Sequence, residues 1–224
     1  MILAIETTGK CGSVALLDGD RCLREIRLIE RSAKSLVPTL VRLLDEEHFD
    51  GIDVVAVVVG PGSFTGLRIG VATAKTLAYA LGTKIVAVDT MFTVAAGFRG
   101  VENSVRFLSV GVDAQRGDVV TQTFELSRQG PQPLSERRLI SVAEWWGEKD
   151  RYSGIQFTGP ALERFGSLAP DGVILADESL RMPMASAAGR LAATRLADDE
   201  FDDPWSLVPI YSRLSAAEER QSTA

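Results

Sequence analysis

The sequence lacks most of the side chains that carry catalysis in hydrolases and metalloenzymes. Its 224 residues include one histidine, His48, in an acidic stretch where a solvated or structural role is expected. No His, Cys and Asp spacing matches a zinc or iron site. No serine lies in a Gly-x-Ser-x-Gly elbow, because Pro61 and Thr65 occupy the flanking positions around Ser63. These absences argue against hydrolysis by a serine or metal mechanism.

Cysteines and long apolar runs are also scarce. The two cysteines, Cys11 and Cys22, make no disulfide framework and are expected to be reduced. No segment has the apolar length that crosses a bilayer, and no basic region precedes the first apolar run. We therefore expect a cytoplasmic protein without a membrane partner.

Basic clusters are missing as well. The formal net charge is -6 and the isoelectric point is about 5.0. Tight binding to nucleic acid usually needs a basic face that neutralises phosphates. Arginines between Arg24 and Arg31 alternate with Glu25 and Glu30 instead. If the chain acts on nucleic acid, we expect a partner to hold it.

The most informative segment that is present is the glycine-rich run 60–82. It follows an apolar strand candidate, 54–59, and continues into a helical pattern. Such a loop suits either an anion site or a tight turn before a packed helix, but no Gly-Lys-Ser/Thr ends it as in a Walker A loop. Small residues recur at every fourth position, at Gly66, Gly70, Ala74, Ala78 and Gly82. One helix face therefore admits another backbone closely.

The first half of the chain predicts a mixed sheet. Strand candidates 2–7, 12–18 and 22–29 have short connections, which favour antiparallel hairpins. A helix over 35–47 follows, with Ser35 as its cap and Pro38 in its first turn. The apolar strands 54–59 and 84–90 are typical of parallel strands that are covered on both faces.

The second half repeats this plan more weakly. Three strand candidates, 106–114, 118–126 and 133–141, precede a helix that Ser141 and Glu144 open as a capping box. A strand, a short helix, a strand and a final helix follow. The repeat predicts a duplicated α/β unit, βββαβαβ, with the boundary near 97–103. Two such lobes resemble the ribonuclease H-like architecture of actin, Hsp70 and sugar kinases. We expect lobes over 1–97 and 98–224.

The end of the first strand is a candidate nucleotide or phosphate site. A carboxylate, two hydroxyls and a glycine follow one another there, and could hold hydrated magnesium and phosphate oxygens. A second carboxylate across the cleft would complete the site. The candidate residues are Glu6, Thr7, Thr8, Gly60, Gly62, Ser63 and Asp113. The alternative interpretation is a polar hairpin end, and the residues alone leave both open.

The helices over 35–47 and 66–82 are a candidate partner interface, since adjacent units should place them side by side. The candidate residues are Leu36, Thr39, Leu40, Leu43, Arg68, Val71, Ala72, Lys75, Thr76 and Tyr79. The alternative is that both helices bury these faces within their own lobe.

Five segments together resemble the bacterial TsaB family, also called YeaZ. They are ILAIETT at the start, GPGSFTGLRIG at 60–70, DTMFTVA, VDAQRGDV and the C-terminal VPIYSRLSAAEE. The resemblance extends over nearly the whole chain and is firmest over residues 1–114. It implies a two-lobed protein that helps to form threonylcarbamoyladenosine at position 37 of tRNAs reading codons that begin with A.

The resemblance also implies partners. Members of the family are non-catalytic paralogues of the catalytic subunit TsaD, historically labelled a glycoprotease, and bind it through the two helices described above. The ATPase TsaE joins the assembly, tRNA is reached only through the complex, and the chain alone would form a homodimer.

The catalytic relative carries two metal-binding histidines, and here Thr90 and Val94 stand at those positions. Neither ligates a metal as imidazole does, so we expect a pseudo-enzyme without metal or cofactor. Glu6 stands where many relatives have Asp, so weak ATP or ADP binding at the complex interface stays open. The alternative is an active enzyme of the same fold, a kinase or a glycoprotease-like peptidase. The polar tail after Leu214 is predicted to be partly disordered.

Overall fold

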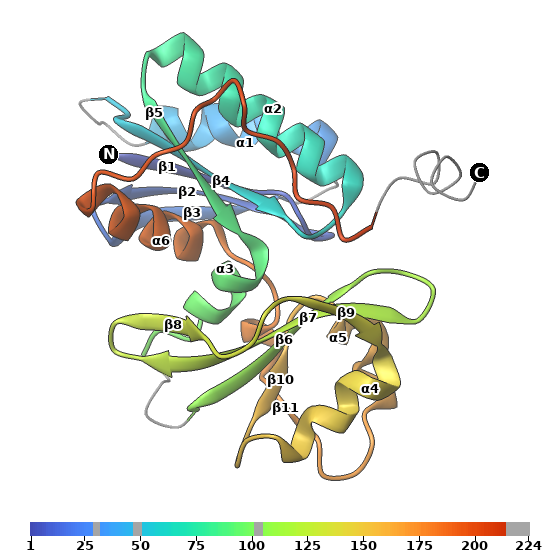
Figure 1. The fold of residues 1–224 in the computed structure, drawn as a ribbon. Helices are drawn as coiled ribbons and strands as arrows, with labels where there is room; N and C mark the ends of the chain where they lie inside the picture. Colours follow the sequence, from blue (N-terminus) through green and yellow to red (C-terminus); the bar gives the residue numbers. More distant parts are fainter. Residues whose placement is uncertain (29–31, 47–50, 101–104, 214–224) are drawn as a thin grey trace.

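The computed structural model describes residues 1–28, 32–46, 51–100 and 105–213. The predictions for His48 and for the tail after Leu214 lie outside these residues. Two lobes, each built around a mixed sheet, lie one above the other, and a short helix, α3 (Thr90–Ala96), lies between them (Figure 1). In the described part of the chain, no helix is both long enough and apolar enough to cross a membrane.

The first sheet has the strand order β3-β2-β1-β4-β5. Its strands are β1 (Ile2–Glu6), β2 (Ser13–Asp18), β3 (Arg21–Arg27), β4 (Val54–Gly60) and β5 (Lys84–Asp89). The first three pair antiparallel, whereas β4 runs parallel to both β1 and β5. The predicted hairpins and parallel strands are confirmed.

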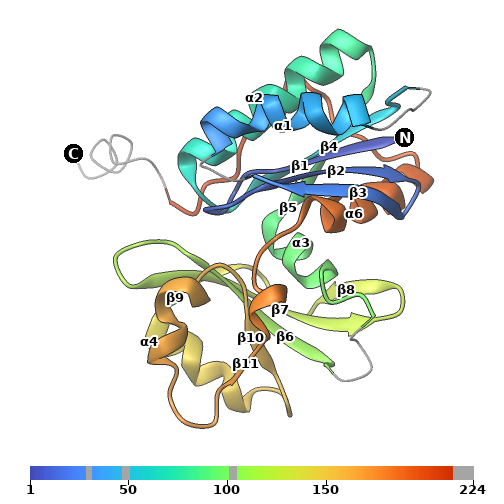
Figure 2. The ribbon, with the colours of Figure 1, turned by 180° about the vertical axis from the view of Figure 1, so that it is seen from behind.

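Helices cover both faces of this sheet. Helices α1 (Ser32–Glu46) and α2 (Phe64–Leu81) lie side by side on one face, and α6 (Ala185–Ala197) lies on the other (Figures 1 and 2). Because α1 begins at Ser32, Ser35 lies inside its first turns, and the prediction that Ser35 caps the helix is wrong.

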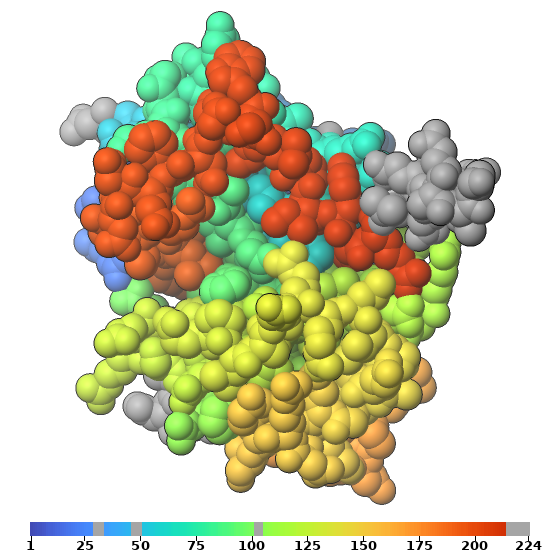
Figure 3. All heavy atoms as spheres, in the orientation of Figure 1, coloured from blue at the N-terminus to red at the C-terminus, as the bar shows by residue number. Residues whose placement is uncertain are grey.

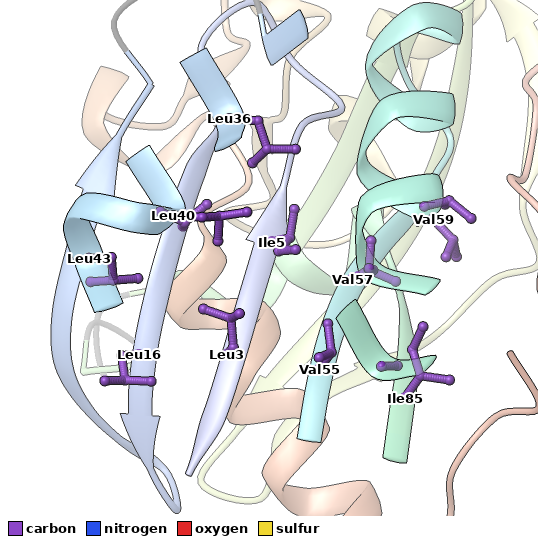
Figure 4. Packing of buried hydrophobic residues seen from close by; sticks show 14 of the residues in the cluster. Leu3, Ile5, Leu16, Leu36, Leu40, Leu43, Val55, Val57, Val59 and Ile85 are labelled. Carbon is purple, nitrogen blue, oxygen red and sulfur yellow. The ribbon is translucent and has the colours of Figure 1, made fainter. Parts of the chain in front are cut away.

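The core of the first lobe fills the space between the helices and the sheet. Leucines from α1 point toward Leu3, Ile5 and Leu16 of the sheet, while Val55 and Val57 of β4 lie under α2 (Figure 4). All seven residues of β4 are buried, as expected for a central parallel strand with helices on both faces.

The second sheet repeats the topology of the first, in the order β11-β10-β6-β7-β8, with β9 also paired to β7. Its strands are β6 (Phe107–Asp113), β7 (Asp118–Ser127), β8 (Gly130–Pro133), β9 (Arg138–Ser141), β10 (Gln156–Thr158) and β11 (Ile174–Leu175). Strands β6, β10 and β11 are parallel, and β6 and β7 are antiparallel. The duplicated plan is confirmed.

The single strand predicted over 133–141 is wrong, because two short strands occupy this region. Strand β8 pairs with one end of β7 and β9 with the other. Between them, the backbone N–H of Thr123 donates to the Ser135 hydroxyl instead of to a strand carbonyl, at 3.0 Å. Pro131 and Pro133 have no backbone N–H, so they cannot donate the hydrogen bonds that would extend β8 into a longer strand.

Helices α4 (Val142–Trp146) and α5 (Leu162–Phe165) cover the far face of the second sheet. Three 3-10 turns accompany them, η1 (Gly147–Asp150), η2 (Gly166–Leu168) and η3 (Glu178–Leu180). The capping box is confirmed, since the Ser141 hydroxyl accepts from Glu144 N–H and the Glu144 carboxylate accepts from Ser141 N–H.

The lobe boundary predicted at residue 97 is wrong for the last part of the chain. Ala185, Ala188 and Ala192 of α6 pack on the first sheet, and the N-terminus of α6 donates backbone N–H groups to Ser13 and Glu25. The chain then continues along α2 as far as residue 213 (Figure 1). The first lobe is therefore built from both ends of the sequence.

Candidate functional site

The glycine loop between β4 and α2 packs on the end of β1. The backbone N–H of Ser63 donates to the carbonyl of Thr8 at 2.8 Å, and a Cβ on Gly62 would overlap Thr8. Gly60 has φ +117, a region that favours glycine, and a Cβ there would overlap the carbonyl of Ile210. Glycine is thus needed here because the chain's own backbone lies against the loop.

The small-residue face of α2 does admit a second backbone, as predicted. A Cβ on Gly66 would overlap the Thr7 carbonyl, and a Cβ on Gly70 would overlap the Thr7 hydroxyl. That hydroxyl also donates to the carbonyl of Gly66 at 2.8 Å. The backbone that fills the groove therefore belongs to Thr7, the residue that follows β1 in the same chain.

Glu6 ends β1 as a fully buried carboxyl group. Its Oε1 accepts from the Thr8 N–H at 2.5 Å and from the Thr8 hydroxyl at 2.6 Å, while its Oε2 is buried without a hydrogen-bond partner. Burial raises the pKa of Glu6 to about 7, against the opposing effect of the hydrogen bonds from Thr8 and Gly9. Near neutral pH the group is therefore close to half protonated.

Asp113 lies in the other lobe, at the end of β6. Its Oδ1 accepts from Gln115 N–H at 2.7 Å, and its Oδ2 pairs with Arg164 at 3.3 Å. The lobes meet nearby, where Lys10 after β1 pairs with Glu163 of α5 at 3.7 Å. The carboxylate of Asp113 is thus engaged within its own lobe.

The predicted nucleotide or phosphate residues fall into two groups. Residues Glu6, Thr7, Thr8, Gly60, Gly62 and Ser63 lie together, and Asp113 is held separately. The grouped residues do not fit a nucleotide with magnesium in this arrangement, because Thr7 and Thr8 fill the glycine loop and the Glu6 carboxyl is desolvated. The geometry favours the interpretation of a polar hairpin end.

Thr90 and Val94, which the family resemblance aligns with the metal-binding histidines of the catalytic relative, lie on α3. Thr90 and Val94 are both buried there, one helical turn apart. Among the described residues, no three His, Cys, Asp or Glu side chains gather in a cluster that could hold a metal ion.

Part of the predicted partner interface is wrong, because four of its residues face inward. Leu36, Leu40 and Leu43 of α1 (Figure 4) belong to the core of the first lobe, and so does Val71 of α2. The leucine stripe of α1 covers the sheet, which removes these side chains from water.

The opposite side of the two helices is exposed. Val37 and Val41, one turn apart on α1, are 60% and 53% exposed, and Ala72 and Thr76 are exposed on α2. We call these four residues the α1–α2 outer face. The two valines were missed, although their i, i+4 spacing beside the leucine stripe is a signal that the sequence carries. Thr39 is half-buried on α1.

The C-terminal segment occupies one flank of α2 and engages three predicted interface residues. Lys75 donates to the carbonyl of Leu207 at 3.1 Å, and Arg68 donates to the hydroxyl of Tyr211 at 3.1 Å. Tyr79 contacts Trp205 edge to face, with ring centroids 5.9 Å apart. The segment thereby extends the exposed surface of α2 with aromatic side chains.

Two sheets with this strand order and these helical layers define the class of protein. The chain is a two-lobed α/β protein with a ribonuclease H-like fold, duplicated in the manner of actin-like proteins. Solved structures agree on the fold. YeaZ from Pseudomonas aeruginosa superposes with a TM-score of 0.76 over 94% of this chain and 98% of its own, at 24% identity. A second structure, described as an uncharacterized protein with similarity to peptidase YEAZ from Pseudomonas aeruginosa, superposes with a TM-score of 0.78. The superposition covers 95% of this chain and 99% of that structure, at 24% identity.

Sequence comparison identifies the family. The model of the family described as TsaD, tRNA N6-adenosine threonylcarbamoyltransferase, matches residues 29–171. The tRNA threonylcarbamoyladenosine biosynthesis protein TsaB of Bacillus subtilis is 30% identical over 97% of this chain and 96% of its own length. The TsaB protein of Escherichia coli is 27% identical over 96% of each. The chain belongs to the TsaB (YeaZ) family.

Proposed function

We propose that this chain is a non-catalytic subunit of the machinery that forms threonylcarbamoyladenosine at position 37 of tRNAs reading codons that begin with A. Family membership assigns it to tRNA threonylcarbamoyladenosine biosynthesis. The proposal adds the role: the chain binds a TsaD-type catalytic subunit and activates it, together with a TsaE-type ATPase. tRNA is then held by the assembly, in keeping with the net charge of -6.

The observation that carries the proposal is the α1–α2 outer face. It presents two exposed valines one turn apart on α1, and the exposed short side chains of Ala72 and Thr76 on α2, the helix that lies beside α1. Short exposed side chains on two helices that lie side by side let two further helices approach closely. In the absence of the catalytic subunit, the same face would pair two copies of this chain through an isologous contact.

The environments of three described residues also support a non-catalytic role. Glu6 is enclosed and hydrogen-bonded to Thr8, and Thr90 and Val94 are buried where the catalytic relative has histidines. We therefore propose that the glycine loop now serves packing between β1 and α2. Robust ATP hydrolysis or threonylcarbamoyl transfer by the purified chain alone would contradict this.

The test is a single charge placed on the outer face. Ala72→Glu adds a carboxylate at an exposed helix position, so the free chain should fold normally. In a desolvated helix contact the unpaired charge costs about 3 kcal/mol, which corresponds to roughly hundredfold weaker binding. Ala143→Glu is the matched control, since Ala143 is an exposed alanine on α4 of the other lobe.

Binding is measured by calorimetric titration of each variant with the purified TsaD-type subunit. We expect the Ala72→Glu variant to lose binding while its melting temperature stays that of the wild type, and the Ala143→Glu variant to bind normally. Equal affinity of both variants and the wild type would place the contact elsewhere and contradict the proposal.

A further inference from the structure

A cleft between the lobes lies on the opposite side of the first sheet from the α1–α2 outer face. It has a volume of about 530 Å³ and is bounded by β5, α3 and α6 on one wall and by the β7–β8 turn on the other. In Figure 3, green atoms of β5 and α3 are visible beside the orange α6 and above the yellow-green β7–β8 hairpin. This volume is in the range of small-molecule sites.

The floor of the cleft is apolar. Its side chains come from β5, from α3 and the residues just after it, from β7 and from α6. They are Ala87, Phe92, Ala95, Phe98, Leu126 and Leu191. Phe92 is half-buried and contacts Phe124 edge to face, with ring centroids 5.0 Å apart, so its ring is fixed in place. Such a floor favours a flat apolar body.

The rim is rich in arginine: Arg99, Arg128, Arg190 and Arg195 all line the cleft. Two of them are neutralised within the chain. Arg99 pairs with Asp20 at 2.8 Å, and Arg195 pairs with Asp202 at 3.0 Å. The remaining acidic group of the lining, Asp89, pairs with Arg137 and caps α3 through the N–H groups of Met91 and Phe92.

Arg128 and Arg190 are the two arginines of the rim for which the structure shows no ion pair among the described residues. Within residues 1–28, 32–46, 51–100 and 105–213, neither has a carboxylate within ion-pair distance, although Arg190 is close enough to Asp20 to help lower the pKa of that carboxyl. The Nε of Arg190 is buried and has no hydrogen-bond partner. The Arg190 side chain nevertheless lines the cleft, so its positive charge is available to an anion bound there.

We propose that this cleft binds an organic phosphate carried on a flat apolar ring. The ring would lie on the floor formed around Phe92 and Leu191. The phosphate would be held between Arg190 of the first lobe and Arg128 on the β7–β8 turn of the second. Guanidinium groups bind phosphate oxygens through paired, charge-assisted hydrogen bonds, which favours a phosphate dianion over a neutral ligand. Because the two arginines belong to different lobes, the ligand would also hold the lobes together.

The test is isothermal titration calorimetry of the full chain with 1-naphthyl phosphate, and separately with 1-naphthol and inorganic phosphate. We expect 1-naphthyl phosphate to bind at least tenfold more tightly than either of the other two, because only it engages both the floor and the arginines. Equal affinity for 1-naphthol, or no heat of binding at millimolar concentration, would overturn the proposal.

Variants locate the site. Arg190→Gln and Arg128→Gln should each weaken 1-naphthyl phosphate binding at least tenfold, and Arg128 is exposed on a turn, so its variant should fold. Arg42→Gln is the matched control, since Arg42 is an exposed arginine on α1, across the first sheet from the cleft. Unchanged binding in both cleft variants, or an equal loss in the Arg42→Gln variant, would overturn the assignment. This proposal does not depend on the proposed function: Arg128→Gln should bind the TsaD-type subunit normally.

Discussion

Glu6 shows that the sequence can predict the position of a residue without predicting its environment. Its place at the end of the first strand, followed by Thr7 and Thr8, was evident from the sequence, and the structure brings these residues together with the glycine loop. Its environment was not evident, because the complete burial of the carboxyl arises from elements that lie far apart in the sequence. Whether such a group holds magnesium or closes a hairpin depends on that burial.

The raised pKa of Glu6 predicts a pH dependence of stability. The carboxyl has a pKa of 4.5 in an unfolded chain and about 7 when folded. Both states are protonated below pH 4.5, and between the two values only the unfolded state ionises. The free energy of unfolding therefore falls as pH rises through this window, by about 3 kcal/mol in total, and is constant above it.

Glu6→Gln should remove this dependence while keeping the shape of the side chain. We expect the variant to gain stability relative to the wild type as the pH is raised from 5 to 8, measured by urea unfolding. Glu144→Gln is the control, because the pKa of the exposed Glu144 is lowered by hydrogen bonds from Ser141 and its ionisation is complete in this range. Parallel profiles for Glu6→Gln and the wild type would contradict the burial described here.

A second residue-scale prediction concerns the glycine face of α2. Gly66→Ala should destabilise the fold by about 1–3 kcal/mol, because the new Cβ meets the Thr7 carbonyl, which cannot move without β1. Gly147→Ala is the control, since a Cβ there meets nothing within 4 Å. Urea unfolding of the two variants should separate them, and equal stability would show that α2 does not lie this close to β1.

At the scale of elements, periodicity predicted the helices and strands well but not what each face contacts. The four-residue spacing of small residues in α2 correctly indicates a close backbone approach, yet the approaching backbone is that of Thr7 in the same chain. Likewise, Leu36 and Leu40 mark the apolar face of α1, which covers the sheet. An apolar stripe has the same pattern whether it packs inside a lobe or against a partner.

The C-terminal segment along α2 is an element that periodicity could not place. It is anchored by Leu207, which is 8% exposed and whose carbonyl accepts from Lys75. Leu207→Ala should lower the free energy of unfolding by about 2–3 kcal/mol, because a buried side chain is removed. Val208→Ala, at a position 68% exposed, should change it by less than about 0.5 kcal/mol. A thermal unfolding series that ranks them in the reverse order would contradict this anchor.

At the scale of the whole molecule, the repeat of strand and helix patterns predicted two lobes with one topology, and both sheets have it. The pattern could not show that α6 leaves the second lobe. Its alanine face, with Ala188 and Ala192, indicates only that it packs closely on some sheet. The first lobe is thus completed by α6 on one face of its sheet and by the C-terminal segment, which runs along α2 next to the surface proposed to bind a partner.

The central claim is that this chain acts through its α1–α2 outer face and performs no transfer chemistry itself. The most direct test measures threonylcarbamoyladenosine formed on tRNA by purified TsaD-type and TsaE-type subunits with wild-type chain, the Ala72→Glu variant or no addition. We predict full modification with the wild type, and a loss with the Ala72→Glu variant that approaches the level without the chain. Full modification with the Ala72→Glu variant, or without any of this chain, would contradict the claim.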